Sequence, residues 1–187
     1  METQLRRSNL KSDLFDPKTE LDFFTVESSK LKKTEIACSQ SHLQALFKIA
    51  SSNTSDPVLI LEDDASLEKD FYQRTMEIFN SLTESWDILH VGYCFDKPRT
   101  CQSRTIHSNH CKKTSGHVLA CLHAYFVHGS RAANKILDAL NTPHPVIIDQ
   151  KMSRTTSNYY ISLPRLAKQF PFPSDNDNVI DQWKLDL

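Results

Sequence analysis

The sequence lacks the features that would assign it to a membrane or nucleic-acid-binding class. No apolar run approaches the roughly 20 residues needed to cross a bilayer, and the opening METQLRR lacks the apolar stretch of a signal peptide. Lys and Arg total 22 against 23 for Asp and Glu, so the formal net charge of -1 provides no general field for a polyanion. We therefore expect no membrane-spanning segment and no nucleic-acid partner.

Cysteine is present in an odd number, so the 5 thiols cannot all pair within the chain. Several cysteines and histidines follow Cys94, but their spacing matches no compact zinc pattern. They are Cys101, His107, His110, Cys111, His117 and His123. An oxidising compartment would favour a disulfide such as Cys101–Cys111, and free thiols are the alternative. Cysteine usage therefore leaves the compartment open.

The overall composition is that of an ordinary globular protein. In the 187 residues, 39% are hydrophobic and 24% are charged, so neither disorder nor a fibrous chain is indicated. The sequence contains no internal repeat and no low-complexity tract. We expect one soluble domain spanning residues 1–187.

Helices and strands alternate in the predicted order, which favours an α/β domain with a mostly parallel sheet and helices on both faces. Hydrophobic residues at helical spacing predict helices over residues 35–50, 71–82 and 130–140, and a short one after Asp149. Apolar or β-branched runs predict strands over residues 58–61, 86–92, 117–127 and 159–163. The first of these has no alternation, so we expect it to be buried on both faces. Residues 94–116 and 171–178 are expected to be irregular.

Three acids, Glu62-Asp63-Asp64, directly follow the strand predicted over residues 58–61. They would lie at the carboxyl edge of the sheet, where open α/β folds place their ligands. Carboxylates select Mn²⁺ or Mg²⁺, and such a metal keeps open positions for the oxygens of a diphosphate. It would neutralise the charge that develops as a sugar–phosphate bond breaks. The alternative is a solvated turn after a strand.

Several sequence blocks along the chain closely resemble glycosyltransferase family 25 and occur in the family's order. The blocks are EIACSQSHL from residue 35, LILEDDA from 59, WDILHVG from 86, HAYFV from 123, AANKIL from 132, IDQ from 148 and PSD from 173. Any one block would be weak evidence. Together, over most of the chain from about Arg6, they make a specific match.

The resemblance implies a GT-A fold and a specific reaction class. The reaction would be transfer of a hexose, galactose or glucose, from a nucleotide sugar, usually UDP-linked, to a hydroxyl acceptor. The family includes bacterial lipopolysaccharide glycosyltransferases and the galactosyltransferase domain of collagen-modifying enzymes. The acceptor would accordingly be a glycan, a lipopolysaccharide or a protein. The compartment would be the cytoplasm for a bacterial-type member and the ER or Golgi lumen for a eukaryotic-type one.

The same resemblance assigns roles to site residues. Glu62, Asp63 and Asp64 would form the metal-binding acidic motif, with Asp63 and Asp64 as metal ligands and Glu62 in the cofactor pocket. Asp64 lies farthest beyond the strand end, so we expect it to be the direct ligand. Asp149 would act near the acceptor, taking its proton or bonding the donor sugar. A helix N-cap is the alternative for Asp149.

Three further residues of the matching blocks are candidates for the cofactor site. His42, on the helix before the acids, has the alternative of a buried histidine bonded to a backbone carbonyl. Tyr125 could stack on the nucleotide base or pack in the core. Gln150 shares the IDQ block with Asp149 and is placed with the cofactor-binding residues.

The opening of the chain departs from the family pattern. Family members begin with a buried strand ending in an Asn-Leu-x-Arg type segment, whereas here Arg6 and Arg7 fit its arginines and the strand itself is missing. Both arginines could pair with phosphate, or be solvated charge. We expect unpaired backbone groups beside residues 58–61 and weak binding of nucleotide diphosphates with little base preference.

Two other interpretations stay open. The chain could be a truncated, catalytically inactive relative that acts as a binding protein. Alternatively, VLILEDD looks like the first strand and acidic pocket of a response-regulator receiver domain, which binds Mg²⁺ and accepts a phosphoryl group. A receiver needs its phosphoacceptor at the end of a later strand, whereas Asp87 begins the next one.

Overall fold

The computed structural model describes residues 33–82, 85–94, 109–112, 121–141, 147–156 and 158–170. Within these ranges no helix combines the length and the apolar character needed to span a bilayer. Arg6 and Arg7, most of the segment between residues 94 and 121, and the tail from residue 171 lie outside the described residues.

The core of the fold is a 5-stranded sheet in the order β1-β5-β3-β6-β4. Its strands are β1 (Pro57–Leu61), β3 (Ile88–Gly92), β4 (His110–Lys112), β5 (Ala124–His128) and β6 (Tyr159–Ser162). Only β3 and β6 pair in parallel, and the other neighbouring pairs are antiparallel. The mostly parallel sheet that we expected is therefore wrong. An apolar run indicates that a strand is buried, but it carries no information about the direction of its neighbours.

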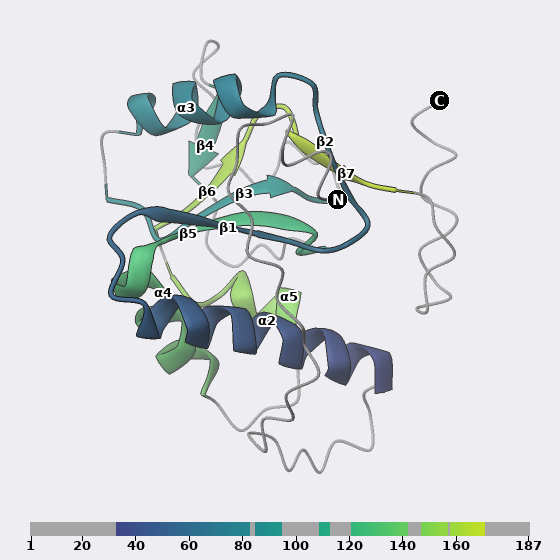
Figure 1. Cartoon of the computed structure of the whole chain (residues 1–187), viewed down its shortest axis with the longest axis vertical. Coiled ribbons are helices and arrows are strands. Elements are labelled where there is room, and N and C mark those ends of the chain that lie inside the picture. Colours follow the sequence, from purple (N-terminus) through teal and green to yellow (C-terminus); the bar gives the residue numbers. More distant parts are fainter. Residues whose placement is uncertain are drawn as a thin grey trace.

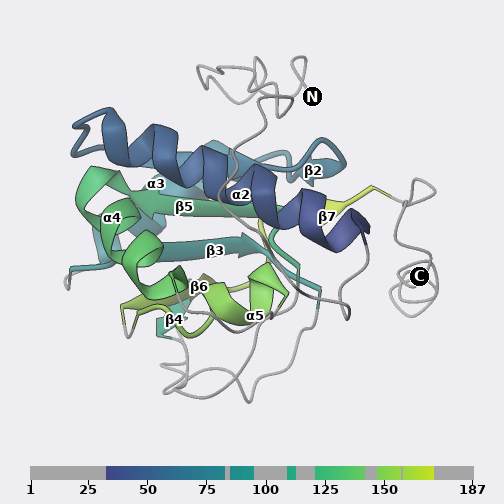
Figure 2. The same ribbon diagram turned by 90° about the horizontal axis from the view of Figure 1, so that it is seen from below.

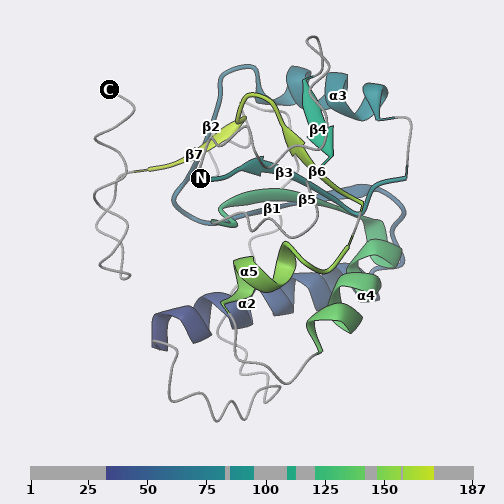
Figure 3. The same ribbon diagram turned by 180° about the vertical axis from the view of Figure 1, so that it is seen from behind.

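Helices cover both faces of this sheet, as predicted. On one face lie α2 (Lys33–Ser51), α4 (Gly129–Leu140) and the short α5 (Ile148–Met152), and on the other lies α3 (Phe71–Ser81) (Figure 1). In Figure 2, α2 crosses β5, α4 lies by one end of β5 and β3, and α5 lies beside β6. In the view from behind, the sheet lies between α3 and the helices α2, α4 and α5 (Figure 3).

Successive side chains of the central strand β5 point to opposite faces of the sheet and pack into a separate hydrophobic core on each face. Tyr125 and Val127 point into the cluster beneath α2, α4 and α5, and Phe126 points into the cluster beneath α3. In the second cluster Phe71 and Ile78 of α3 are each 1% exposed. Burying a side chain of this size stabilises a fold by about 1.5–3 kcal/mol, so these contacts fix α3 on the sheet.

The start of α4 is tied to the end of α2 by a close backbone approach. Gly129 has a φ of +70°, and a Cβ there would lie 2.6 Å from the carbonyl oxygen of Thr54. The hydroxyl of the next residue, Ser130, donates to the carbonyl of Ile49 in α2 at 2.9 Å. The helix predicted over residues 130–140 begins one residue earlier, at Gly129, so Ser130 does not cap it.

Two parts of the architecture were not predicted. A 2-stranded sheet of β2 (Ala65–Leu67) and β7 (Ala167–Gln169) follows the acids, and β4 interrupts the segment expected to be a long loop. The strand β1 pairs with β5 on one side and with no other described strand. It is thus an edge of the described sheet and is half-buried, not buried on both faces.

Candidate active site

The strand directions gather residues from distant parts of the sequence at one end of the sheet. Because β1 and β3 both run antiparallel to β5, the residues after β1 and β3 meet those before β5. The three acids occupy the turn between β1 and β2. The backbone N–H of Glu62 donates to the carbonyl of His123 at 3.0 Å, and the N–H of Ala65 donates to the carbonyl of Glu62 at 3.1 Å. The acidic turn is therefore anchored to the neighbouring strand.

Glu62 turns toward helix α2. Its Oε1 lies 3.0 Å from Nε2 of His42, whose Nδ1 lies 3.0 Å from the hydroxyl of Tyr125. The contact to the carboxylate places a proton on Nε2, so the Tyr125 hydroxyl donates to Nδ1 when the ring is neutral. Burial raises the pKa of Glu62, but the hydrogen bond from His42 and the favourable electrostatics of His42 and His123 together outweigh burial, so the pKa is lowered. Glu62 is thus held as a carboxylate.

Asp64 is oriented from the opposite side by the β7 segment. Its Oδ2 accepts a hydrogen bond from Nε2 of Gln169 at 2.8 Å, and its carbonyl accepts one from the N–H of Phe170 at 2.6 Å. Its Oδ1 is buried without a hydrogen-bond partner among the described residues. Burial, together with the charges of Glu62 and Asp63, raises its pKa. Asp63 between them is exposed.

The thiol of Cys38 lies beside Glu62. Its Sγ is 3.8 Å from Oε1 of Glu62. Burial raises its pKa to about 12, with further contributions from the charges of Glu62, Asp149 and Asp64. The charges that act on this thiol therefore come from two acids of the acidic turn and from Asp149 in α5. We did not single out Cys38 from the sequence, although it lies one helical turn before His42, on the same face of α2.

Asp149 lies in the first turn of α5 and does not cap that helix, whose N-cap is Ile147. Its Oδ2 accepts a hydrogen bond from the N–H of Cys121 at 3.2 Å, and its Oδ1 accepts one from the N–H of Gln150 at 2.8 Å. The N-cap alternative is thus not what the structure shows. The carboxylate instead joins α5 to the segment that leads into β5.

The other predicted cofactor residues take different positions. Tyr125 has no exposed surface, so its contact with the site runs through His42. His42 is 4% exposed and bonds to side chains, not to a backbone carbonyl. Gln150 follows Asp149 in α5. Gln169, which holds Asp64, was missed because it lies 105 residues away in sequence.

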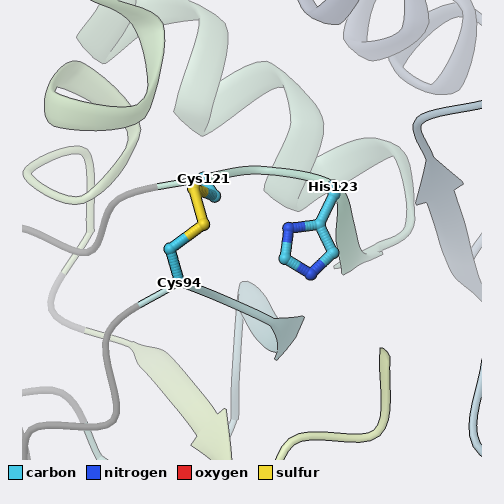
Figure 4. Close-up of side chains that lie close together, drawn as sticks. All are labelled: Cys94, Cys121 and His123. Carbon is cyan, nitrogen blue, oxygen red and sulfur yellow. A yellow bond between two sulfur atoms is a disulfide. The ribbon is translucent and has the colours of Figure 1, made fainter. Parts of the chain in front are cut away.

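A disulfide between Cys94 and Cys121 closes the same end of the sheet (Figure 4). The Cα atoms are 5.7 Å apart, and the bond links the end of β3 to the start of the β5 segment. From the sequence we named Cys101–Cys111 as an example pair. Those side chains lie outside the described residues, and the pair that forms follows from the pairing of β3 with β5. Burial lowers the pKa of the adjacent His123, so its ring is neutral.

The sheet directions count against the receiver interpretation, because a receiver has the parallel doubly wound sheet of the flavodoxin-like folds. Comparison with curated proteins gives no match. The sequence model of glycosyltransferase family 25 (LPS biosynthesis protein) matches residues 7–170. This match spans the acidic turn, His42, Cys38 and Asp149. The chain therefore belongs to glycosyltransferase family 25.

Proposed function

We propose that this chain transfers a hexose from a UDP-linked sugar to a hydroxyl acceptor on a glycan, a lipopolysaccharide or a protein. Family membership makes it a glycosyltransferase with a nucleotide-sugar donor. The structural observation that supports a metal-dependent reaction is the environment of Asp64, which lies beside two further acids. One of its oxygens is buried without a partner, and within the described chain no lysine or arginine pairs with it.

The acidic turn fits a divalent cation. Like charges on Glu62, Asp63 and Asp64 raise the free energy of the folded chain, and a cation would relieve that repulsion. The carboxylates of Asp63 and Asp64 would hold Mn²⁺ or Mg²⁺, which prefer oxygen ligands. When bound, the metal would neutralise the charge that develops on the departing diphosphate.

The surrounding residues would act by positioning. The amide of Gln169 fixes the carboxylate of Asp64, and His42 holds Glu62 in its ionised form beside it. Tyr125 holds the ring of His42. These contacts would keep the acidic turn in one geometry before the donor binds, which limits the ordering that catalysis would otherwise require.

Asp149 would serve the acceptor. Each of its oxygens accepts one backbone N–H, which fixes its position while leaving lone pairs on both oxygens. A carboxylate held in this way can take the proton of the attacking hydroxyl. Arg6 and Arg7, outside the described residues, would pair with the phosphates of the donor.

The test is a screen of nucleotide sugars for manganese-dependent binding and hydrolysis, with calorimetry of UDP, ADP and GDP. We expect Asp64→Asn to weaken metal-dependent nucleotide binding by more than about 100-fold, because outer-shell changes alone cost about 10–100-fold in metal affinity. Asp138→Asn, an exposed aspartate on α4, is the matched control and should bind as the wild type does. Unchanged binding in Asp64→Asn would remove the metal assignment. Binding without turnover would favour the inactive relative.

A further inference from the structure

We propose that the chain contains a redox-gated zinc site: after reduction of the Cys94–Cys121 disulfide, the two thiolates and Nδ1 of His123 bind one Zn²⁺. This site shares no ligand with the acidic turn, although Gln169 contacts both Sγ of Cys94 and Oδ2 of Asp64. The proposal does not depend on the transfer reaction. Figure 4 shows the three side chains, with the imidazole of His123 beside the disulfide.

The ligand atoms are already close enough for one ion. Sγ of Cys94, Sγ of Cys121 and one ring nitrogen of His123 all lie within 4.8 Å of one another. Around a tetrahedral zinc, with Zn–S of about 2.3 Å and Zn–N of about 2.0–2.1 Å, two sulfurs lie about 3.8 Å apart and sulfur and nitrogen about 3.5 Å apart. Once the S–S bond is broken, rotation of the two side chains can supply this separation, because the Cα atoms are 5.7 Å apart.

His123 is in the tautomer that a metal requires. Its Nε2 lies 3.4 Å from the carbonyl oxygen of Ala167, and since a carbonyl only accepts, Nε2 carries the proton. The lone pair is then on Nδ1, which is buried, has no partner among the described residues and faces the disulfide (Figure 4). Zinc-binding histidines commonly donate their other N–H to a backbone carbonyl in this way.

The orientation of this ring is fixed by its neighbours. The His123 side chain is 1% exposed. A Cβ on Gly92 would lie 2.5 Å from both Cδ2 and Nε2 of the ring, so only glycine leaves room for it there. The unpartnered nitrogen is thus held toward the two sulfurs by packing, and the ring does not depend on the disulfide for its position.

Both cysteines are also held independently of the bond between them. The N–H of Cys121 donates to Oδ2 of Asp149 at 3.2 Å. Cys94 follows Tyr93, whose carbonyl accepts a hydrogen bond from Nη1 of Arg165 at 3.1 Å and whose hydroxyl donates to the carbonyl of Ser162 at 2.9 Å. Reduction therefore leaves the two Cα atoms near their present positions, and the zinc ligands remain pre-arranged.

The chemistry of the switch balances simply. A dithiol or phosphine reductant supplies two electrons, the S–S bond breaks, and two protons give two thiols. Zinc binding then displaces those two protons. Two thiolates and one imidazole suit Zn²⁺, with the fourth position left to water. Reoxidation by a small-molecule disulfide transfers two electrons from the thiolates to that disulfide, which takes up two protons and leaves as two thiols; the Cys94–Cys121 bond re-forms and the ion is released.

The experiment uses the full chain carrying Cys101→Ser and Cys111→Ser, which removes the two other thiols of this region. It is titrated with Zn²⁺ against a chromophoric chelator, before and after treatment with a phosphine. We expect the reduced chain to bind one equivalent and the oxidised chain to bind none at this site. Co²⁺ in place of Zn²⁺ should show a tetrahedral spectrum with a charge-transfer band of two thiolates. Zinc should raise the Tm of the reduced chain only.

Single substitutions then locate the ion. Cys94→Ser and Cys121→Ser should each weaken zinc binding by more than about 100-fold, since even outer-shell changes cost about 10–100-fold. Cys38→Ser is the matched control, because Cys38, His42 and Glu62 form a second thiol-containing group. Zinc retained by Cys94→Ser and lost by Cys38→Ser would overturn the proposal, as would equal binding by the oxidised chain. If a variant fails to fold, the cobalt spectrum of the unsubstituted cluster still decides the number of thiolates.

Discussion

Each end of the five-stranded sheet has an aspartate, fully buried at one end and half-buried at the other, and the charges of the two are compensated differently. Asp87, before β3, is 0% exposed, and its Oδ2 accepts hydrogen bonds at 2.5 Å from both Nζ of Lys135 and the hydroxyl of Thr156. Asp64, at the opposite end, accepts a hydrogen bond from the neutral amide of Gln169 and lies beside two further acids. Both residues have one oxygen without a partner among the described residues, so that feature alone does not distinguish them.

The difference lies in charge compensation. A buried carboxylate paired with an ammonium is a complete structural unit, whereas a carboxylate clustered with other carboxylates is stable only with a cation or at a raised pKa. The first arrangement ties the start of β3 to α4 and to the segment before β6. The second concentrates like charges at the end of the sheet that carries the acidic turn, which raises the pKa of Asp64. An acid's partners, and not its burial, indicate which role it has.

The largest expected effect is a loss of stability when the ion pair of Asp87 is broken. Lys135→Met leaves the carboxylate of Asp87 buried and uncompensated, which should lower the free energy of unfolding by about 3 kcal/mol. Lys168→Met, which breaks the exposed pair with Glu68 at 3.2 Å, is the control and should cost less than about 1 kcal/mol. Urea denaturation measures both. Loss of nucleotide binding in folded Lys135→Met would show that the two ends are not independent.

An intermediate effect of opposite sign is expected for the acids themselves. Without metal at neutral pH, Asp64→Asn should raise the Tm, because the raised pKa of Asp64 means that its ionised form is disfavoured in the folded chain. The wild type should gain stability relative to this variant as pH falls toward that pKa. Asp87→Asn should lower the Tm under the same conditions. Thermal denaturation of both variants, measured with a chelator and again with manganese, distinguishes a metal-binding aspartate from a structural one. A lower Tm for metal-free Asp64→Asn would mean that Asp64 is structurally compensated as well.

The smallest expected effect concerns Glu62. His42→Phe removes the hydrogen bond and charge that lower the pKa of Glu62, so that pKa should rise. The lowered pKa in the wild type contributes stability above the unfolded value near 4.5, and this contribution is lost as pH falls through the folded value. The difference in stability between wild type and variant should thus shrink below that pH. Carbon NMR titration of the carboxyl group tests the shift directly, and His42→Gln should restore part of it. An unchanged pKa in His42→Phe would show that His42 does not control Glu62.

The sequence by itself determined the local structure and the family. Hydrophobic spacing predicted α2, α3 and α4 to within a few residues, because a helix is specified by contacts three and four positions apart. The apolar run before Glu62-Asp63-Asp64 predicted β1, and the acids that follow it indicated a site. The ordered blocks from EIACSQSHL to IDQ, which all lie within the matched residues 7–170, identified the family.

Only the tertiary structure decided how distant segments meet. An apolar strand looks the same whether its neighbour runs parallel or antiparallel, so the mixed sheet could not be deduced from β1, β3 and β5 separately. The same holds for contacts across the chain. Cys94 pairs with Cys121 because β3 lies beside β5, and Gln169 reaches Asp64 because β7 pairs with β2. His42 reaches Glu62 because α2 packs against the sheet. These pairings depend on strand order and register, which are set by the packing of the whole sheet and not by the residues beside each side chain.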